Sequence, residues 1–342
     1  ALDRAQAELA EGRAALIEPE YVGRLFGKDK VVQIEITLPE SELEDMLANA
    51  MQEEFHVADI TVDGTRLSNV AVRTKGNSSL FSIAGSRGGS SSSRFSFKVD
   101  FNEYVGKQSL WGLKKLNLNN CYSDPSYMRE YLTYEAMEEM GLATPGRVFV
   151  NLSVNGKPWG LYLGVEAIED EFVARYFVNN KGDLYKPDGT GSDLKWISSD
   201  ASDYTGMNLK TPEGRQDKSA LIAFLSAVNG KGGELEDVLD VNAALRYFAV
   251  STALGNFDSY QGQMKHNYYL YQHDGVFTVI GWDYNMSFGG FARMSTDAGA
   301  AVAIDEPVQG ALSDRTLLQR LLEDETYRQS YYGYLRQVVD GF

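Results

Sequence analysis

The 342-residue chain is poor in the residues that most often build metal and redox sites. It has one cysteine, Cys121, and three histidines, His56, His266 and His273. A single thiol excludes an intrachain disulfide and a zinc site built from cysteines. The histidines are too scattered along the chain to predict a shared metal site. One cysteine is compatible with a cytoplasmic protein and with an exported bacterial protein that avoids cysteine.

Common nucleotide-binding and hydrolase motifs are also missing, as is a membrane-spanning segment. Nothing matches G-x-x-x-x-G-K-[ST], which excludes a P-loop, and neither G-x-S-x-G nor H-E-x-x-H occurs. A Ser-His-Asp hydrolase would need His266 or His273 as its base, and no nucleophile motif supports one. No run approaches the roughly 18 apolar residues of a membrane span. Because the chain begins at Ala1 rather than Met, we expect a processed or trimmed amino terminus, with which any signal peptide or anchor would have been lost.

Positive charge is scarce relative to negative charge. The chain has 48 acidic and 32 basic residues, which gives a formal net charge of −16. A surface of this sign repels nucleic acid and anionic lipid, so we expect neither as a partner and favour a basic protein partner. Hydrophobic residues make up 43% and charged residues 23%, as in ordinary globular proteins. The length permits one large domain or two closely packed lobes.

Strand patterns dominate the first half of the chain and helix patterns the second, which predicts an α+β fold. We expect a helical leader over residues 1–28 and one domain over 29–342, with a strand-rich lobe over about 29–168 and a helix-rich lobe over about 169–342. Alternating polarity and turn signals predict strands at 31–38, 58–62, 69–73, 95–101, 115–118, 147–154, 160–167, 268–271 and 276–280. Helical spacing predicts helices at 39–51, 127–140, 170–177, 217–228, 241–254 and 314–339, and residues 179–214 are rich in loop formers.

Residues 82–94 (SIAGSRGGSSSSR) form a low-complexity stretch. Glycines expose backbone N–H groups and Arg87 adds positive charge, so a loop that covers phosphates is one interpretation. A surface insertion between two strands is the other interpretation, and the composition favours it.

The segment from Gly255 to Gly290 places three polar residues at the ends of expected elements. Asp258 follows an apolar helix, Asn267 opens a strand, and Asp283 follows the second strand of a hairpin. Phosphoryl transfer requires a carboxylate that orients or deprotonates the attacking hydroxyl, and amide and carboxylate oxygens that hold Mg²⁺ against the nucleotide phosphates. Protein kinases carry these groups in the same order, with closer spacing. The plain alternative is that Asp and Asn here only form turns.

Short motifs in one order along the chain resemble those of the CotH (spore-coat protein H) family of atypical protein kinases. The resemblance covers residues from about 70 to 290, or roughly two thirds of the chain. Its central part consists of Gly255-Asn256-Phe257-Asp258, the strand His266 to Tyr271, and Trp282-Asp283-Tyr284-Asn285 followed by Phe288-Gly289. Its upstream part consists of Arg73 to Ser79 (RTKGNSS), Phe95 to Lys98 (FSFK), Trp159 to Glu166 (WGLYLGVE) and Leu184 to Lys186 (LYK).

This resemblance implies an atypical kinase-like fold around a nucleotide cleft, with ATP and Mg²⁺, or Mn²⁺, as cofactors. It implies Asp258 as the catalytic carboxylate and Asn267 and Asp283 as metal ligands. The implied reaction is phosphorylation of Ser or Thr hydroxyls on a secreted, envelope or coat protein, which we expect to be basic and rich in Ser and Thr. We therefore expect a secreted or envelope-associated bacterial protein, with a cytoplasmic or spore-coat location as the alternative.

The resemblance also implies residues that bind the nucleotide. Lys98 is the candidate for pairing with phosphate, and Glu166 the candidate for orienting that lysine through an ion pair. The alternatives are a solvent-facing Lys98 and a Glu166 that only caps the following helix. Arg73, Lys75, Lys115 and Lys186 are further candidate cations, and Trp282 or Tyr185 could stack on adenine or belong to the core.

Two departures from the family pattern leave a second function open. Asn285 stands where the family motif has an acidic residue, which puts a second metal ligand in doubt. The Gly/Ser stretch at 82–94 looks like an insertion without an assigned role. The alternative to a kinase is therefore a catalytically inactive relative or a cell-surface binding module with the same fold.

Overall fold

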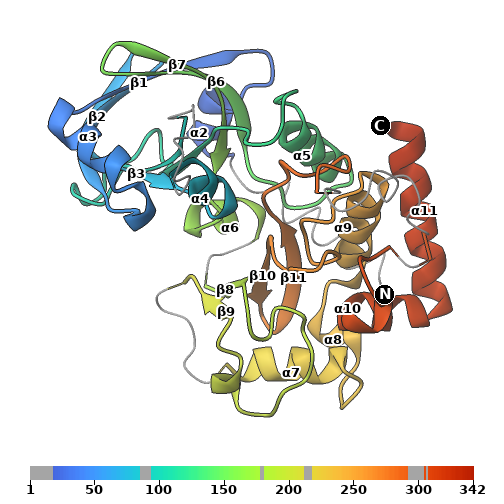
Figure 1. Ribbon diagram of the computed structural model, residues 1–342. Helices are drawn as coiled ribbons and strands as arrows, with labels where there is room; N and C mark the ends of the chain where they lie inside the picture. The colour runs from blue at the N-terminus through green and yellow to red at the C-terminus, as the bar shows by residue number, and fades with distance from the viewer. Residues whose placement is uncertain (1–17, 85–93, 178–180, 212–217, 292–303, 306) are drawn as a thin grey trace. The chain divides into compact units, whose positions relative to one another are not determined.

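The computed structural model describes residues 18–84, 94–177, 181–211, 218–291, 304–305 and 307–342. They form two compact units (Figure 1). The barrel unit consists of Ala15–Tyr127 and Pro145–Arg175; within the described residues, the helical unit consists of Met128–Thr144 and Tyr176–Phe342. The chain passes from one unit to the other after residues 127, 144 and 175, so more than one connection joins them.

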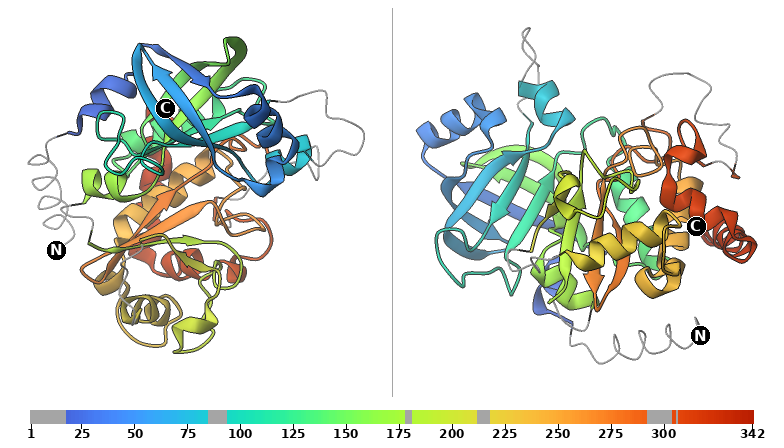
Figure 2. Two further views of the ribbon diagram at one scale, coloured as in Figure 1. Left: turned by 90° about the vertical axis from the view of Figure 1, so that its left-hand side faces the viewer. Right: turned by 90° about the horizontal axis from the view of Figure 1, so that it is seen from below.

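Seven strands of the barrel unit close into a barrel in the order β1-β2-β3-β4-β5-β7-β6 (Figure 2). Neighbouring strands are antiparallel except β1 and β6, whose parallel pairing places Gln33 opposite Asn151 and closes the barrel. The strands are β1 (Val31–Thr37), β2 (His56–Val62), β3 (Thr65–Lys75), β4 (Ser96–Asp100), β5 (Lys115–Asn119), β6 (Arg147–Val154) and β7 (Lys157–Glu166).

Residue alternation along these strands builds the barrel core. In β1 the side chains of Val32, Ile34 and Ile36 are buried, while the intervening residues face outward. Asp63 and Asn155 each adopt a left-handed φ before a glycine, which is the geometry of a tight hairpin turn. The predicted strands of this part of the chain are confirmed.

Short helices complete the barrel unit. They are α2 (Glu20–Leu25), α3 (Glu40–Ala48), a 3₁₀ turn at Ala50–Gln52, α4 (Ser78–Ala84) and α6 (Asp170–Tyr176). Tyr21 and Leu25 of α2 belong to the barrel core, so the described end of the expected leader packs into this unit. Residues 1–17 of that leader, and residues 85–93 of the Gly/Ser stretch, lie outside the described residues.

The helical unit contains a four-stranded antiparallel sheet in the order β11-β10-β8-β9. Helices α7 and α9 contact β11, where Phe224 stacks on Phe277 with 4.6 Å between ring centroids. The strands are β8 (Asp183–Pro187), β9 (Met207–Leu209), β10 (Tyr268–His273) and β11 (Val276–Gly281). The helices are α5 (Arg129–Glu139), α7 (Ser219–Val228), α8 (Leu235–Val238), α9 (Val241–Ala253), α10 (Thr316–Glu323) and α11 (Glu325–Gly341), with 3₁₀ turns at Ala201–Asp203 and Leu312–Asp314.

Two strands that the sequence did not predict lie within the loop-rich residues 179–214. They are β8 and β9, and β8 pairs with β10 inside the sheet. One expectation for this unit is wrong. The expected helix over 314–339 is two helices, because Asp324 is extended (φ −81°, ψ 124°) and its carboxylate accepts hydrogen bonds from the backbone N–H groups of Thr326 and Tyr327. An aspartate in this geometry begins a new helix.

The structure confirms the α+β class, with helices and strands in both units. None of the described helices combines the length and the apolar character that crossing a membrane requires.

Candidate active site

The loop after α9 and the loop after β11 lie against each other. The N–H of Phe288 donates to the carbonyl of Leu254 at 2.6 Å, and the N–H of Gly289 donates to that of Gly255 at 3.3 Å. Gly255 turns the chain out of the helix with a left-handed φ of 56°. The segment that carries Asp258 is thereby joined to the segment that follows Asp283.

The β10–β11 hairpin places Asn267 beside Asp283. Its pairing ends at Tyr268 opposite Gly281, and the N–H of Trp282 donates to the Asn267 carbonyl at 3.1 Å. Asn267 directly precedes β10 and Asp283 follows β11, so both lie at the open end of the hairpin. Both have left-handed φ values, 58° and 62°. Such residues are uncommon outside glycine and cluster at functional sites.

Asp258 reaches the same end of the hairpin through two contacts. The Asn267 amide nitrogen donates to the Asp258 carbonyl at 2.9 Å, which leaves the amide oxygen directed elsewhere. The Asp258 Oδ1 lies 2.8 Å from His266 Nε2, and the two side chains are only 14% and 19% exposed. The structure therefore brings the three residues predicted from the sequence to one place, while their chemical roles stay predictions.

Negative charge concentrates around His266. Burial alone lowers the pKa of His266, but its hydrogen bond to Asp258 and the charges of Asp258, Asp283 and Asp188 outweigh burial and raise that pKa. The sequence motifs do not indicate a role for His266 in this site. Its position directly before Asn267 was the available signal, but sequence spacing does not show which way a ring points.

Tyr134 of α5 supports the acidic residue that follows β11. The N–H of Asp283 donates to the Tyr134 hydroxyl at 3.3 Å. The Tyr134 ring packs edge-on against Tyr284, with 5.0 Å between centroids, and neither ring is exposed to solvent. This packing restricts the backbone of Asp283 and so helps to position its carboxylate.

The donor atoms suit a hard divalent cation. Mg²⁺ prefers oxygen ligands, and it is commonly bound through one or two carboxylates together with water and substrate phosphates. The carboxylate of Asp283 and the amide oxygen of Asn267 fit this pattern. Within the described ranges, no three His, Cys, Asp or Glu side chains group together in a way that could hold a metal ion.

Asn256 is a second residue of this loop whose role the sequence does not indicate. Its side chain is fully buried, and neither its amide nitrogen nor its amide oxygen has a hydrogen-bond partner among the residues that the structure describes. Buried polar groups are almost always paired, so an unpaired amide two residues from Asp258 requires a cause. Groups of this kind often mark a strained or ligand-binding position.

The candidate lysines Lys98 and Lys115 lie together on the barrel unit. Glu169 bridges them, with 3.3 Å from Lys98 Nζ to one carboxylate oxygen and 2.6 Å from Lys115 Nζ to the other. Asp100 adds a contact of 3.5 Å to Lys115. Burial lowers the pKa of Lys115, but its hydrogen bonds to Glu169 and Asp100 and their charges outweigh burial and raise that pKa. Glu169 therefore holds both lysine side chains in place.

The predicted ion pair between Lys98 and Glu166 is wrong. The barrel register places Lys98 opposite Asn117, and Asn117 opposite Val165, so Lys98 shares its sheet face with Val165. Glu166 is the next residue along β7 and therefore points to the other face. Glu169, three residues further on, takes the place that was expected for Glu166.

Glu166 instead holds the barrel unit together. Its carboxylate is fully buried and accepts hydrogen bonds from the Tyr21 hydroxyl at 2.6 Å, the Gly146 N–H at 2.8 Å and Arg175 at 2.5 Å. These contacts join α2, β7 and α6. A buried carboxylate is tolerated when it is paired and hydrogen-bonded in this way.

The remaining candidates are engaged within their own units. Arg73 pairs with Glu53 at 2.5 Å, and Lys75 Nζ donates to the Asn119 side chain at 2.8 Å. Lys186 Nζ lies 5.6 Å from the centre of the Tyr269 ring. Trp282 and Tyr185 are 7% and 1% exposed and belong to the core, which is the alternative to adenine stacking that the sequence left open.

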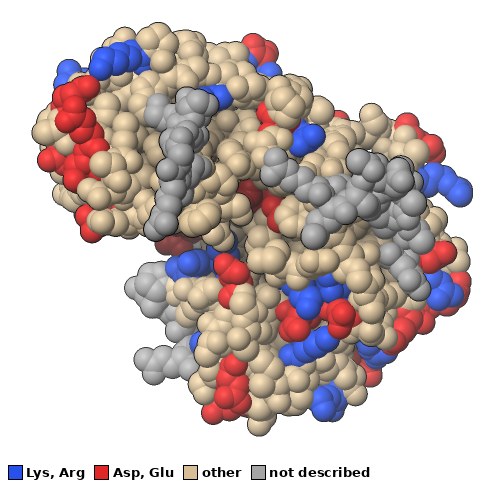
Figure 3. All heavy atoms as spheres, viewed as in Figure 1, with Lys and Arg blue, Asp and Glu red and all other residues tan. Residues whose placement is uncertain are grey.

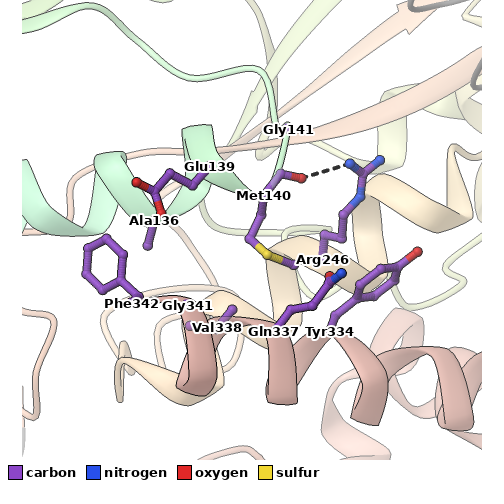
Figure 4. A pocket seen from close by; sticks show the side chains of 10 residues that line it. All are labelled: Ala136, Glu139, Met140, Gly141, Arg246, Tyr334, Gln337, Val338, Gly341 and Phe342. Atoms are coloured by element: carbon purple, nitrogen blue, oxygen red, sulfur yellow. Dashed lines mark hydrogen bonds between the residues drawn. The ribbon is translucent and has the colours of Figure 1, made fainter.

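An open groove of about 550 Å³ lies elsewhere on the helical unit, where α5, α9 and α11 meet (Figure 4). Arg246 crosses it and donates to the Met140 carbonyl at 2.8 Å. Its described lining contains none of the predicted site residues; it consists of Ala136, Glu139, Met140, Gly141, Arg246, Tyr334, Gln337, Val338, Gly341 and Phe342. The groove is therefore separate from the acidic site.

Comparison with known proteins identifies the family. A family model described as "CotH kinase protein" matches residues 72–342, so the chain belongs to this family. The match begins within β3 and includes Lys98, Glu169 and the whole acidic site.

Two proteins of Bacillus subtilis (strain 168) are similar to the chain. The inner spore coat protein H is 27% identical over 240 residues, which cover 67% of this chain and 63% of that protein. The inner spore coat protein H-like protein is 37% identical over 64 residues, which cover 19% of this chain and 21% of that protein. The chain thus spans less than two thirds of the length of the relatives that it matches.

Proposed function

We propose that this protein is an ATP- and Mg²⁺-dependent protein kinase that transfers the γ-phosphoryl group to Ser or Thr hydroxyls. The observation that carries the proposal is the gathering of Asp258, Asn267 and Asp283 at the open end of the β10–β11 hairpin, in a chain that belongs to the CotH kinase family. Phosphoryl transfer depends mainly on positioning and on neutralising phosphate charge, and these three side chains supply the required oxygens.

The three residues have different tasks. Asp283 and the amide oxygen of Asn267 would hold Mg²⁺, which would neutralise charge on the nucleotide phosphates. Asp258 accepts a hydrogen bond from His266 on one carboxylate oxygen. Its other oxygen orients the acceptor hydroxyl and accepts its proton, as the catalytic aspartate of a protein kinase does.

Lys98 and Lys115 are the proposed phosphate cations. Glu169 holds both ammonium groups on the outer face of the barrel and so takes the orienting role that was first assigned to Glu166. A lysine fixed by a carboxylate is preorganised, because it loses less side-chain freedom when it meets a phosphate.

The proposed substrate is a basic, Ser- and Thr-rich protein of a spore coat, an envelope or the extracellular space. The named relatives are inner spore coat proteins, which favours a coat substrate and a coat location. The net charge of −16 favours a basic partner. Figure 3 shows part of this acidic excess gathered over α3, which carries Glu40, Glu42, Glu44 and Asp45.

A catalytically inactive binding module is the second candidate, and Asn285 is the observation that favours it. The family motif has an acidic residue at this position, so the site has one carboxylate fewer than that pattern provides. A module of this kind could retain nucleotide binding without phosphate transfer. The measurement below separates the two functions.

The experiment is incubation with radiolabelled ATP and Mg²⁺, with autophosphorylation and a basic protein acceptor as readouts. We expect Asp258→Asn to bind Mg²⁺-ATP as the wild type does and to transfer phosphate about 10² to 10⁴ times more slowly. We expect Asp283→Asn to lose metal-dependent nucleotide binding. Asparagine tolerates the left-handed φ of Asp283, so this change removes charge with little backbone strain.

Asp274→Asn is the matched control, because Asp274 lies in the turn at the other end of the same hairpin and its side chain is 82% exposed. It should bind and transfer as the wild type does. Lys98→Ala and Lys115→Ala should raise the KM for ATP, whereas Lys114→Ala, which removes a neighbouring lysine paired with Glu171, should not. If Asp258→Asn transferred phosphate at the wild-type rate, the assignment of Asp258 as the catalytic residue would be refuted. If the wild type bound nucleotide but transferred no phosphate, the binding module would be favoured.

A further inference from the structure

We propose that His266 is a positioning residue that fixes one oxygen of the Asp258 carboxylate. The other oxygen of Asp258 then remains available to the acceptor hydroxyl, and the metal ion binds to Asp283 instead of Asp258. This inference rests on the proposed kinase function and goes beyond it, because it explains how two nearby carboxylates take different tasks.

The geometry around Asp258 supports the first part. His266 Nε2 lies 2.8 Å from Asp258 Oδ1, and both side chains are largely shielded from water. Asn267, the next residue, donates its amide to the Asp258 carbonyl at 2.9 Å. Two consecutive residues therefore hold Asp258, one by its carboxylate and one by its backbone.

The local backbone makes this double contact available. Lys265 and Asn267, on either side of His266, have left-handed φ values of 52° and 58°. Two such residues so close together are costly for non-glycine side chains and persist only where the surroundings impose them. The turn aims the side chains of His266 and Asn267 at the same residue instead of at opposite faces, as successive residues of a strand would be.

The charges support the second part. Asp258, Asp283 and Asp188 all act electrostatically on His266. Asp258 and Asp283 both carry carboxylate oxygens, the ligands that a divalent ion such as Mg²⁺ prefers, so either could bind the ion. The hydrogen bond from His266 Nε2 occupies Asp258 Oδ1, so this oxygen binds a metal ion less strongly. The ion is thereby left to Asp283 and Asn267, and Asp258 stays available to the hydroxyl.

The first test separates catalysis from binding in the full chain. We expect His266→Leu to lower kcat about 10- to 100-fold, the loss typical when a group that orients a functional side chain is removed, while the KM for ATP and the Mg²⁺ requirement stay within about twofold. His266→Gln should recover most of the rate, because the glutamine amide nitrogen can donate from near the position of Nε2. The matched control is His273→Gln at the far end of β10, away from Asp258, which should retain the wild-type rate.

A structural role alone predicts a different pattern. If His266 only packed the loop, His266→Leu would raise the KM for ATP and lower kcat together, or His266→Gln would fail to recover the rate; either result would overturn the proposal. Unchanged kcat in His266→Leu would also overturn it.

The second test does not depend on activity. With three histidines in the chain, the imidazole ¹H–¹⁵N spectrum holds few signals to assign. We expect one Nε2–H proton of the wild type to be shifted downfield and protected from exchange, to disappear in His266→Gln, and to move in Asp258→Asn but not in Asp274→Asn. Absence of such a signal would overturn the inference. A wild type that shows the signal but transfers no phosphate would refute the kinase function instead.

Discussion

Two buried polar side chains, one in each unit, differ in their hydrogen-bond partners. In the barrel unit, the buried carboxylate of Glu166 has three partners, Tyr21, Gly146 and Arg175. In the helical unit, the equally buried amide of Asn256 has no hydrogen-bond partner within the described part of the chain. Paired groups stabilise a fold, whereas unpaired ones cost free energy and persist where another requirement imposes them. The difference indicates that Glu166 stabilises the barrel unit, whereas Asn256 is retained for a reason other than stability.

Left-handed backbone occurs in both units, in different settings. Asp63 and Asn155 adopt left-handed φ values in hairpin turns of the barrel, where that conformation is ordinary. In the helical unit, Lys265, Asn267 and Asp283 adopt it within the loops of the candidate active site, where it sets the directions of their side chains.

The largest expected effect tests the barrel side of this comparison. We expect Glu166→Ala to lower the free energy of unfolding by about 3–5 kcal/mol, because it leaves Arg175 buried without its carboxylate. Chemical denaturation followed by fluorescence measures this change. Glu20→Ala is the control, since its pair with Arg24 is exposed and should contribute no more than about 1 kcal/mol. Equal effects from the two changes would contradict the claim that the barrel depends on its buried pair.

An effect of opposite sign is expected at Asn256. Asn256→Leu keeps the size of the side chain and removes a buried amide that has no protein partner, so we expect the free energy of unfolding to rise by about 1–3 kcal/mol. We also expect phosphate transfer to fall, which is the usual exchange of activity for stability at a functional site. Denaturation and the radiolabel assay measure the two changes. A loss of stability would show that Asn256 is paired with a bound water or ion.

The smallest expected effect tests whether the regular parts of the helical unit obey the same local rules as the barrel. Asp324→Ala removes the carboxylate that accepts from Thr326 and Tyr327 at the start of α11, and should cost about 1 kcal/mol. Asp324→Asn should cost much less, because asparagine also begins helices well. The midpoint of thermal unfolding distinguishes the two, and an equal loss in both would mean that the charge rather than the hydrogen bond matters.

Much of the fold follows from local sequence patterns, and the errors have local causes. Alternating residues and the Asp63-Gly64 and Asn155-Gly156 turns predict the hairpins of the barrel. Closure of the barrel was not predicted, because the parallel pairing of β1 with β6 leaves no local trace in either strand. The strand β8 was missed because its five residues include Asp183, Lys186 and Pro187, and its burial comes from its neighbours in the sheet.

The candidate site was predictable to the same limited extent. The order of Asp258, Asn267 and Asp283 identified residues that the structure brings together, because hairpin geometry follows from sequence. The predicted partner of Lys98, Glu166, points to the other face of the sheet, and Glu169 pairs with Lys98 instead. The error arose because the register between β5 and β7 cannot be read from either strand alone. The contact between His266 and Asp258 depends on two left-handed residues, which propensity does not reveal.

The parallel pairing of β1 with β6 has a consequence for how the protein folds. It joins residues as far apart as Gln33 and Asn151, 118 positions along the chain. Long loops are slow to close, so this pairing should form late and limit the folding rate. Until the ribosome has released β6, β1 has an unpaired edge that can associate with other chains. In the chain, α5 of the helical unit lies between β5 and the last two barrel strands, β6 and β7. While α5 is being synthesised, five barrel strands already exist without the strand that closes the barrel, and we expect the nascent chain to be prone to aggregation during this period.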